Sequence, residues 1–256
     1  MLGAFSGRVF LGSAQRRLCA SGVPVLTYHK IAEPPPQTTD PFLYASPRRF
    51  EEQLSALRRH NFQTVSLTAG LPRSGNADRS VAITFDDGCR NVLNHALEPL
   101  ARHKFQAIQF LVSDFLGKKN EWDVAKGDVA EPLMDEAEIR EWLAAGHEVG
   151  SHTATHRNLR HLSATEAREE IFGSKKSLED RFGLAIKHFC YPYGSWNEAV
   201  RDLVADAGYQ TACTMDFGVN TAASPRFELR RIIPLSSGEL LAKIFHRLGR
   251  KFRRSH

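Results

Sequence analysis

The amino-acid sequence predicts an α/β protein with a mostly parallel sheet, and two observations carry that prediction. Short apolar runs typical of buried strands alternate at least seven times with longer amphipathic stretches typical of helices. The composition is globular, with 42% of the 256 residues apolar and 25% charged, which is enough to bury one large core. Helical crossovers between parallel strands occur both in closed barrels and in open, doubly wound sheets, so the alternation does not decide between these two architectures.

The expected strands are short runs rich in β-branched, aliphatic and aromatic residues. In chain order they are residues 23–29, 62–67, 81–87, 106–112, 147–152, 187–192, 209–214 and 227–235.

The expected helices carry apolar residues three and four positions apart, as Phe50, Leu54 and Leu57 do in the first of them. A capping-box pattern begins the fourth helix at Ser163, and Gly183 ends it. In chain order the helices are residues 47–60, 91–103, 135–146, 163–183 and 195–208.

Two long loops are predicted, at residues 33–41 and 117–132. Both come after the carboxyl end of a strand, where barrel and open-sheet enzymes build their sites. Long loops in a compact domain are usually functional or disordered, so both are candidates for shaping a site.

The two ends of the chain differ from the predicted central domain, residues 23–235. Residues 1–22 form a poorly specified N-terminal segment, in which three arginines interrupt the apolar residues and oppose a secretory signal. Residues 236–256 predict a helix with an apolar stripe and a basic face, in a chain of net charge +5. That helix either docks on the protein or binds anionic lipid head groups.

Several classes of protein are excluded by the rest of the sequence. The four cysteines show no CxxC pairing, which favours a reducing compartment over a disulfide framework. No apolar run approaches the roughly 20 residues that cross a bilayer. Basic residues are not interleaved with aromatic ones, so nucleic acid is not an expected partner. We therefore expect a cytoplasmic protein, with peripheral contact to the inner face of the membrane through the C-terminal helix.

Two groups of polar residues at strand ends suggest a metal site. Asp86 and Asp87 end one predicted strand, while His152 ends another and His156 follows four positions later, a spacing at which two imidazoles on one helical turn converge. A parallel sheet brings both groups to the same rim. One carboxylate and two imidazoles form a common catalytic zinc set, and the second carboxylate is then available as a base. The alternative is that an aspartate caps the following helix.

The sequence TFDDG at residues 84–88, HTATH at 152–156 and CYPYG at 190–194 resembles the first three motifs of the NodB-like polysaccharide deacetylases, carbohydrate esterase family 4. The resemblance extends over residues 23–235. It implies a distorted (β/α) barrel of about seven parallel strands. It also implies metal-dependent removal of acetyl groups from an N-acetylated glycan, a polysaccharide or a lipid-linked sugar.

The resemblance also implies roles for individual residues. Asp86 is the general base, while Asp87, His152 and His156 hold a divalent ion, most often zinc in this family. The backbone N–H of Tyr193 is a candidate donor to the oxyanion.

This sequence departs from the family pattern at two places. Cys190 stands where the family commonly has an arginine that pairs with the base, and Arg231, or failing that Arg230, is the nearest replacement. The late Leu-x-His motif that supplies the acid is also missing. A circularly permuted subgroup resembling the poly-N-acetylglucosamine deacetylases carries the acid on the first strand, where His29 lies here.

His29 has a second interpretation, as a strand-end histidine satisfied by a backbone group. If His29 is the acid, a carboxylate such as Asp216 or Asp40 is expected to keep it protonated. Aromatic residues in or beside the rim loops are candidates for the sugar platform: Tyr193, Trp196, Tyr28 and Trp122. Trp142 and Tyr209 are expected in the core.

The sequence therefore predicts a metal-dependent N-deacetylase. Two alternatives remain: an amide hydrolase, such as a deformylase, that acts on another small or lipid-linked amino sugar, and a non-catalytic relative that only binds glycan. The missing arginine at Cys190 favours the last of these, whereas the complete set of two aspartates and two histidines opposes it.

Overall fold

The computed structural model describes residues 22–67 and 79–234. The predicted N-terminal segment and the predicted basic helix at 236–256 lie outside the described residues. No helix in the described part of the chain is long and apolar enough to span a bilayer. Cys89, Cys190 and Cys213 are free and buried there, as the absence of paired cysteine motifs predicts.

The centre of the molecule is a closed sheet of parallel strands. Its strands, in spatial order, are β1 (Val23–Tyr28), β5 (Ser80–Phe85), β6 (Ile108–Leu111), β7 (Glu148–Ser151), β8 (His188–Cys190), β9 (Thr211–Phe217) and β11 (Leu229–Arg231). Ile232, just after β11, closes the ring on β1: its N–H donates to the Val25 carbonyl at 2.8 Å, and its carbonyl accepts from Thr27 N–H at 3.0 Å. The prediction of a distorted (β/α) barrel is confirmed, and the open, doubly wound alternative is wrong.

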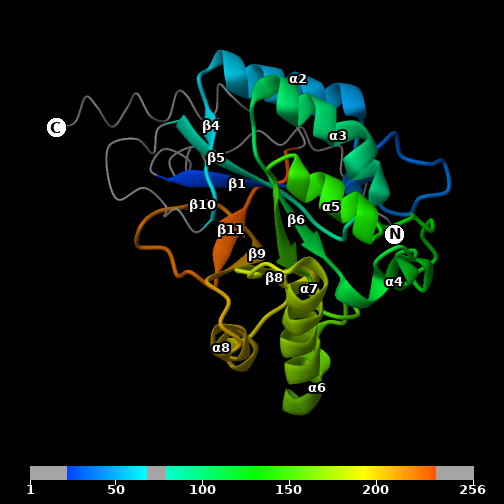
Figure 1. Ribbon diagram of the computed structural model, residues 1–256, viewed down its shortest axis with the longest axis vertical. Coiled ribbons are helices and arrows are strands. Elements are labelled where there is room, and N and C mark those ends of the chain that lie inside the picture. Colours follow the sequence, from blue (N-terminus) through cyan, green and yellow to red (C-terminus); the bar gives the residue numbers. More distant parts are fainter. Residues whose placement is uncertain (1–21, 68–78, 235–256) are drawn as a thin grey trace, which may run out of the picture.

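Helices cover the outside of this barrel (Figure 1). One side carries α2 (Pro47–Arg59), α3 (Arg90–His103) and α5 (Glu136–Ala144), and the other carries α6 (Ala164–Arg168), α7 (Ser174–Phe182) and α8 (Glu198–Asp206). The short helix α4 (Glu121–Val124) lies in the loop after β6. Four further strands have two residues each. β4 (Gln63–Thr64) pairs with β5 and β10 (Val219–Asn220) pairs with β1, whereas β2 (Lys30–Ile31) and β3 (Tyr44–Ala45) form a separate two-stranded sheet.

The predicted helix at 163–183 forms in two parts. Its capping box is present, with the Ser163 hydroxyl accepting from Glu166 N–H, and it ends at Gly183 in the left-handed conformation that glycine favours. Between α6 and α7 the chain makes a π-helical turn, Glu169–Gly173, which no sequence pattern predicted. Such turns are rare and frequently lie at functional sites.

The apolar residues divide between the inside of the barrel and the layer beneath the helices. Inside the barrel, Val25, Phe110 and Cys213 are fully buried in one cluster. Trp142 and Tyr209 lie in the outer layer, so their prediction as core residues is confirmed.

Gly150 on β7 is a sensitive position in this packing. A Cβ there would lie 2.6 Å from the Phe110 ring and 2.8 Å from the His188 carbonyl. We expect Gly150→Ala to lower the free energy of unfolding by about 1–3 kcal/mol, because overpacking forces side chains and backbone to move. Denaturant titration measures this, with Gly173→Ala as the control, since nothing lies within 4 Å of a Cβ at Gly173. Equal stability of the two variants would contradict the expectation.

Candidate active site

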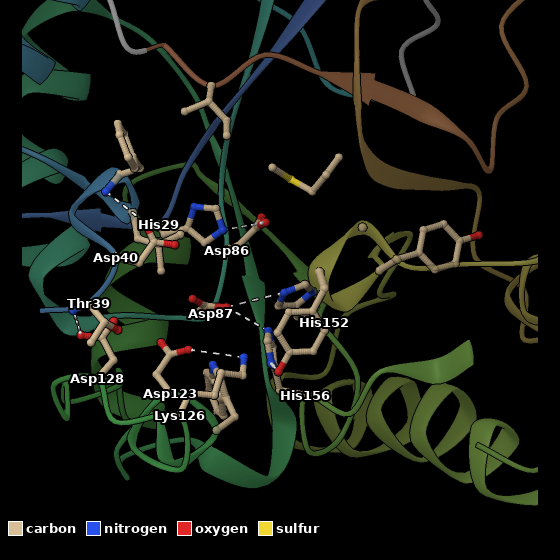
Figure 2. Close-up of a pocket in the computed structure, with 18 of the residues that line it drawn as sticks. His29, Thr39, Asp40, Asp86, Asp87, Asp123, Lys126, Asp128, His152 and His156 are labelled. Carbon is tan, nitrogen blue, oxygen red and sulfur yellow. Dashed lines mark hydrogen bonds and ion pairs between the residues drawn. The ribbon is translucent and has the colours of Figure 1, made fainter. Parts of the chain in front are cut away.

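The carboxyl ends of the parallel strands meet around a cavity of about 650 Å³, which we call the rim cavity. Five of its residues lie at the carboxyl ends of five different strands: His29 follows β1, Asp86 follows β5, His152 follows β7, Tyr191 follows β8, and Arg231 is the last residue of β11. Figure 2 shows Asp87 facing His152 and His156, and Asp86 facing His29. Residues far apart in the sequence therefore converge as the parallel sheet predicts.

Asp87, His152 and His156 are buried and lie close enough together to bind one metal ion. The Asp87 Oδ1 atom lies 3.5 Å from His152 Nε2 and 3.4 Å from His156 Nε2. The prediction that the two histidines converge is confirmed, but the expected helical turn is wrong. The segment is a loop in which Thr153, with φ of 70°, and His156, with φ of 62°, adopt the left-handed conformation.

The other ring nitrogens of the two histidines are held by the protein. His152 Nδ1 lies 2.8 Å from the Cys190 carbonyl, and His156 Nδ1 lies 3.1 Å from the Tyr193 hydroxyl. A carbonyl only accepts, so His152 Nδ1 carries a proton and donates. Burial, together with the neighbouring His156 ring, lowers the pKa of His152 to about 4. The Nε2 atom of His152 is therefore an unprotonated lone pair near neutral pH.

These contacts test whether a metal ion fits between the three residues. The unprotonated His152 Nε2 faces a carboxylate oxygen, and Asp87 Oδ1 is buried without a hydrogen-bond partner. Two acceptors facing each other across a buried space are unfavourable unless a cation lies between them. Two imidazole nitrogens and one carboxylate oxygen are a known catalytic ligand set for zinc. The donor set therefore fits a divalent ion.

The Asp86 carboxylate forms an ion pair with Arg231 and does not cap the helix that follows it. The two Arg231 Nη atoms donate to the two Asp86 oxygens at 2.7 Å each, and Arg231 Nε donates to the Thr214 carbonyl. Burial alone would raise the pKa of Asp86, but the Arg231 guanidinium lowers it. The predicted pairing of Arg231 with Asp86 is confirmed, whereas Arg230 is exposed.

The capping interpretation of the aspartates is wrong. The N-cap of α3 is Cys89, and no side chain caps that helix. Cys190, which stands where the family has its arginine, places its Sγ 3.6 Å from Asp86 Oδ2. Burial raises the pKa of the Cys190 thiol well above its usual value, so the sulfur stays protonated and adds no second negative charge beside Asp86.

His29 lines the rim cavity, and its Nε2 lies 3.6 Å from Asp86 Oδ2. The expected carboxylate partners were different. Asp40 does line the cavity, but its carboxylate accepts from Phe42 N–H, and Asp216 is exposed and outside the lining. The ion pair that the structure gives His29 is with Asp86, so the prediction of Asp40 or Asp216 as its partner is wrong.

The candidate aromatic residues separate into two pairs. Tyr193 and Trp122 line the rim cavity. Tyr28 is 4% exposed and its hydroxyl donates to Gln53, so its prediction as a sugar platform is wrong: its side chain points outward from the barrel and packs under α2. Trp196 is half-buried, stacks on Tyr191 with the ring centroids 6.2 Å apart and is not part of the cavity lining, so its role as a sugar platform stays a prediction.

Glu170, in the π-helical turn, supports the loop at residues 152–156, which we call the histidine loop. Nothing in the sequence pointed to this role. One of its carboxylate oxygens accepts from Thr155 N–H at 2.8 Å, the other accepts from the Thr155 hydroxyl, and its carbonyl accepts from Ala154 N–H. The residue is 6% exposed. It belongs to a predicted helix, and nothing in a helical pattern indicates which loop a buried glutamate will contact.

The two long loops meet over the rim cavity. Asp128 Oδ1 accepts from the Thr38 hydroxyl at 2.8 Å and from Thr39 N–H at 3.0 Å. Lys30, fully buried, places its Nζ 3.3 Å from Asp123 Oδ2 and so ties the second loop to the barrel. The sequence predicted that these loops shape a site, but their contact with each other was not predicted.

In barrel enzymes the catalytic acid and base groups lie at the carboxyl ends of the parallel strands, as the acid and base groups do here. Residues 73–212, more than half of the chain, match the model of the family described as polysaccharide deacetylase. The chain therefore belongs to the polysaccharide deacetylase family, whose members are hydrolases of N-acetyl amide bonds. The predicted resemblance is confirmed.

Individual relatives agree with the family match. The Bacillus subtilis protein YxkH, provisionally described as a polysaccharide deacetylase, is 24% identical over 214 residues, which cover 82% of this chain and 70% of YxkH. A chitooligosaccharide deacetylase of Sinorhizobium fredii is 29% identical over 54% of this chain and 58% of its own length. This chain thus spans little more than half of the rhizobial enzyme.

A solved structure supports the fold. The Streptococcus pyogenes deacetylase PplD, in complex with acetate, superposes with a TM-score of 0.75 at 23% identity, covering 88% of this chain and 98% of PplD. At this identity the similarity bears on the fold alone.

Proposed function

We propose that this chain removes N-acetyl groups from an amino-sugar polysaccharide or a lipid-linked glycan, with Asp87, His152 and His156 holding a divalent ion, best suited to zinc. The observation that carries the proposal is the buried Asp87 Oδ1, which has no hydrogen-bond partner and faces two imidazole nitrogens. When bound, the ion polarises the amide carbonyl and acidifies a water molecule.

The side chains around this site divide the proton transfers between them. Asp86, kept ionised by Arg231, accepts a proton from the attacking water. His29, 3.6 Å from Asp86, delivers a proton to the departing amine, because an amide nitrogen leaves poorly without one. Acetate and the free amine of the sugar are the products. Tyr193 lines the cavity, and its backbone N–H is the donor that we assign to the developing oxyanion.

The proposal is tested by acetate release from N-acetylglucosamine oligomers. The purified protein is assayed as isolated, after chelation, and after zinc is added back. We expect acetate release that disappears on chelation and returns with zinc. Release that persists in metal-free protein would overturn the role of the metal, and no release under any condition would overturn the substrate class.

We also propose that residues 236–256 hold the enzyme peripherally at the cytoplasmic face of a membrane, a proposal that rests on their sequence alone. Sedimentation with vesicles tests it. The full chain should bind vesicles containing anionic lipid and be released by salt, whereas a variant ending at residue 235 should remain in solution. Equal binding of both chains would contradict the proposal.

Glu170 provides a prediction about the metal ligands. We expect Glu170→Gln to weaken zinc binding by roughly 10- to 100-fold, because the glutamine amide cannot accept from both Thr155 groups that fix the histidine loop. Competition against a chelator measures the affinity. The control is Glu169→Gln, an exposed neighbour, which should bind zinc as the wild type does. Unchanged affinity in Glu170→Gln would show that the contact does not position the ligands.

A further inference from the structure

A second cavity, of about 630 Å³, adjoins the rim cavity, and we call it the side groove. Four residues line both: Trp122, Lys126, His156 and Tyr193. The rest of the side groove is lined by Thr155, Arg157, Asn158, His161 and Leu162. The two cavities therefore lie side by side around these four residues.

The boundary between the two cavities consists of aromatic rings packed around His156. The Trp122 ring stacks on the His156 ring at 4.5 Å, and the Tyr193 ring meets its edge at 4.8 Å. The Lys126 Nζ lies 4.1 Å from the centre of the Tyr193 ring (Figure 2 shows Lys126 beside His156). Tyr193 is 45% exposed. Rings with an apolar face and a polar tip suit the two surfaces of a sugar.

The two cavities differ in the carboxylates that they present. The rim cavity includes the carboxylates of Asp40, Asp123 and Asp128, whereas no carboxylate lines the side groove among the described residues. The Lys and Arg side chains of the side groove are Lys126, which also lines the rim cavity, and Arg157, and its other polar side chains, such as Asn158, are neutral amides and hydroxyls or histidine.

Arg157 is held by an ion pair at one end of its guanidinium. Its Nη2 donates to Glu166 Oε1 at 3.0 Å, and Glu166 lies outside the groove lining. A guanidinium has five N–H donors, so most remain available to a ligand. The acetamide of an N-acetylated sugar offers a carbonyl acceptor to such a surface. The ammonium of a deacetylated sugar offers only donors and a like charge, and it finds no anionic partner there.

We propose that the side groove is the subsite for the sugar next to the one that loses its acetyl group, and that it selects a neighbour that still carries N-acetyl. The proposal rests on the deacetylase function proposed above. Its consequence is that the enzyme works slowest where a neighbour on that side is already deacetylated. Free amines then become dispersed along the glycan instead of contiguous.

Three trisaccharides of N-acetylglucosamine test this: the fully acetylated compound and the two isomers with glucosamine at one end. The measurement is kcat/KM for deacetylation of the central sugar, followed by mass spectrometry. For one isomer we expect kcat/KM to be about tenfold lower than for the fully acetylated compound. A change of that size corresponds to the loss of one hydrogen bond to a charged donor. The other isomer should react normally.

Arg157→Glu should abolish this preference, because the new carboxylate accepts from the ammonium. Arg157→Gln should weaken it, and this milder change covers the case in which Arg157→Glu disturbs the fold. Arg160→Glu is the matched control: Arg160 is exposed, lies three positions along and is not in the lining, so the preference should be unchanged.

Equal rates on all three trisaccharides would overturn the side groove as a selective subsite while leaving the deacetylase function intact. An unchanged preference in both Arg157 variants would overturn it as well. If the wild type releases acetate from none of the trisaccharides, the proposed function fails and this inference fails with it.

Discussion

Asp86→Asn should reduce deacetylation by at least about a hundredfold while the protein keeps its metal ion. The reason is that asparagine cannot accept the proton of the attacking water, and a positioned general base contributes typically 10²- to 10⁴-fold. The metal ligands proposed here are Asp87, His152 and His156, so the substitution leaves the ligand set complete. Acetate release and metal content are measured on the same sample.

The control for Asp86→Asn concerns folding, because Asp86 also pairs with the buried Arg231. Asparagine retains one oxygen that accepts from Arg231, and denaturant unfolding shows how much stability the change costs. If the Asp86→Asn variant is folded, holds its metal ion and keeps wild-type activity, Asp86 is not the general base and serves only as a structural partner of Arg231.

Arg231→Met should give the largest loss of stability, about 3–5 kcal/mol in the free energy of unfolding. Asp86 is 1% exposed, and without the guanidinium it loses both 2.7 Å contacts and keeps only the longer, 3.6 Å contact with His29 as a charged partner among the described residues. Activity should fall too, because the carboxylate then gains a proton more readily and serves poorly as a base. Denaturant titration measures the first effect and acetate release the second.

Two further variants check the Arg231 result. Arg230→Met is the matched control: Arg230 is exposed, so its stability should change by less than about 0.5 kcal/mol. The double variant Asp86→Asn with Arg231→Met should cost less than the sum of the single changes, because the buried charge is gone. If Arg231→Met unfolds at the same denaturant concentration as the wild type, the Asp86–Arg231 pair does not contribute to the free energy of unfolding as proposed.

The barrel and the convergence of its site were predictable because both follow from regular geometry. Alternating strands and helices force parallel pairing, and parallel strands bring their carboxyl ends to one edge. That is why Asp86, His152 and Arg231, far apart in the sequence, could be expected together. The same reasoning correctly preferred Arg231 to Arg230, although adjacent residues on a strand face opposite sides and the sequence alone did not say which faces inward.

The errors come from features that depend on local backbone or on contacts between distant segments. Thr153 and His156 take left-handed conformations that are uncommon for residues other than glycine, so a helical turn was expected instead. Tyr28 directly precedes His29 but points to the other face of the strand, under α2. Glu170 reaches the histidine loop from a π-helical turn, which has no sequence pattern of its own.

The most direct test of the central claim is the zinc content of the wild type, Asp87→Ala and Asp86→Asn after dialysis against buffered zinc. We expect about one ion per chain in the wild type and in Asp86→Asn, and none in Asp87→Ala, because Asp87 faces both imidazole nitrogens. Zinc retained by Asp87→Ala, or absent from the wild type, would contradict the account of Asp87, His152 and His156 as the metal site.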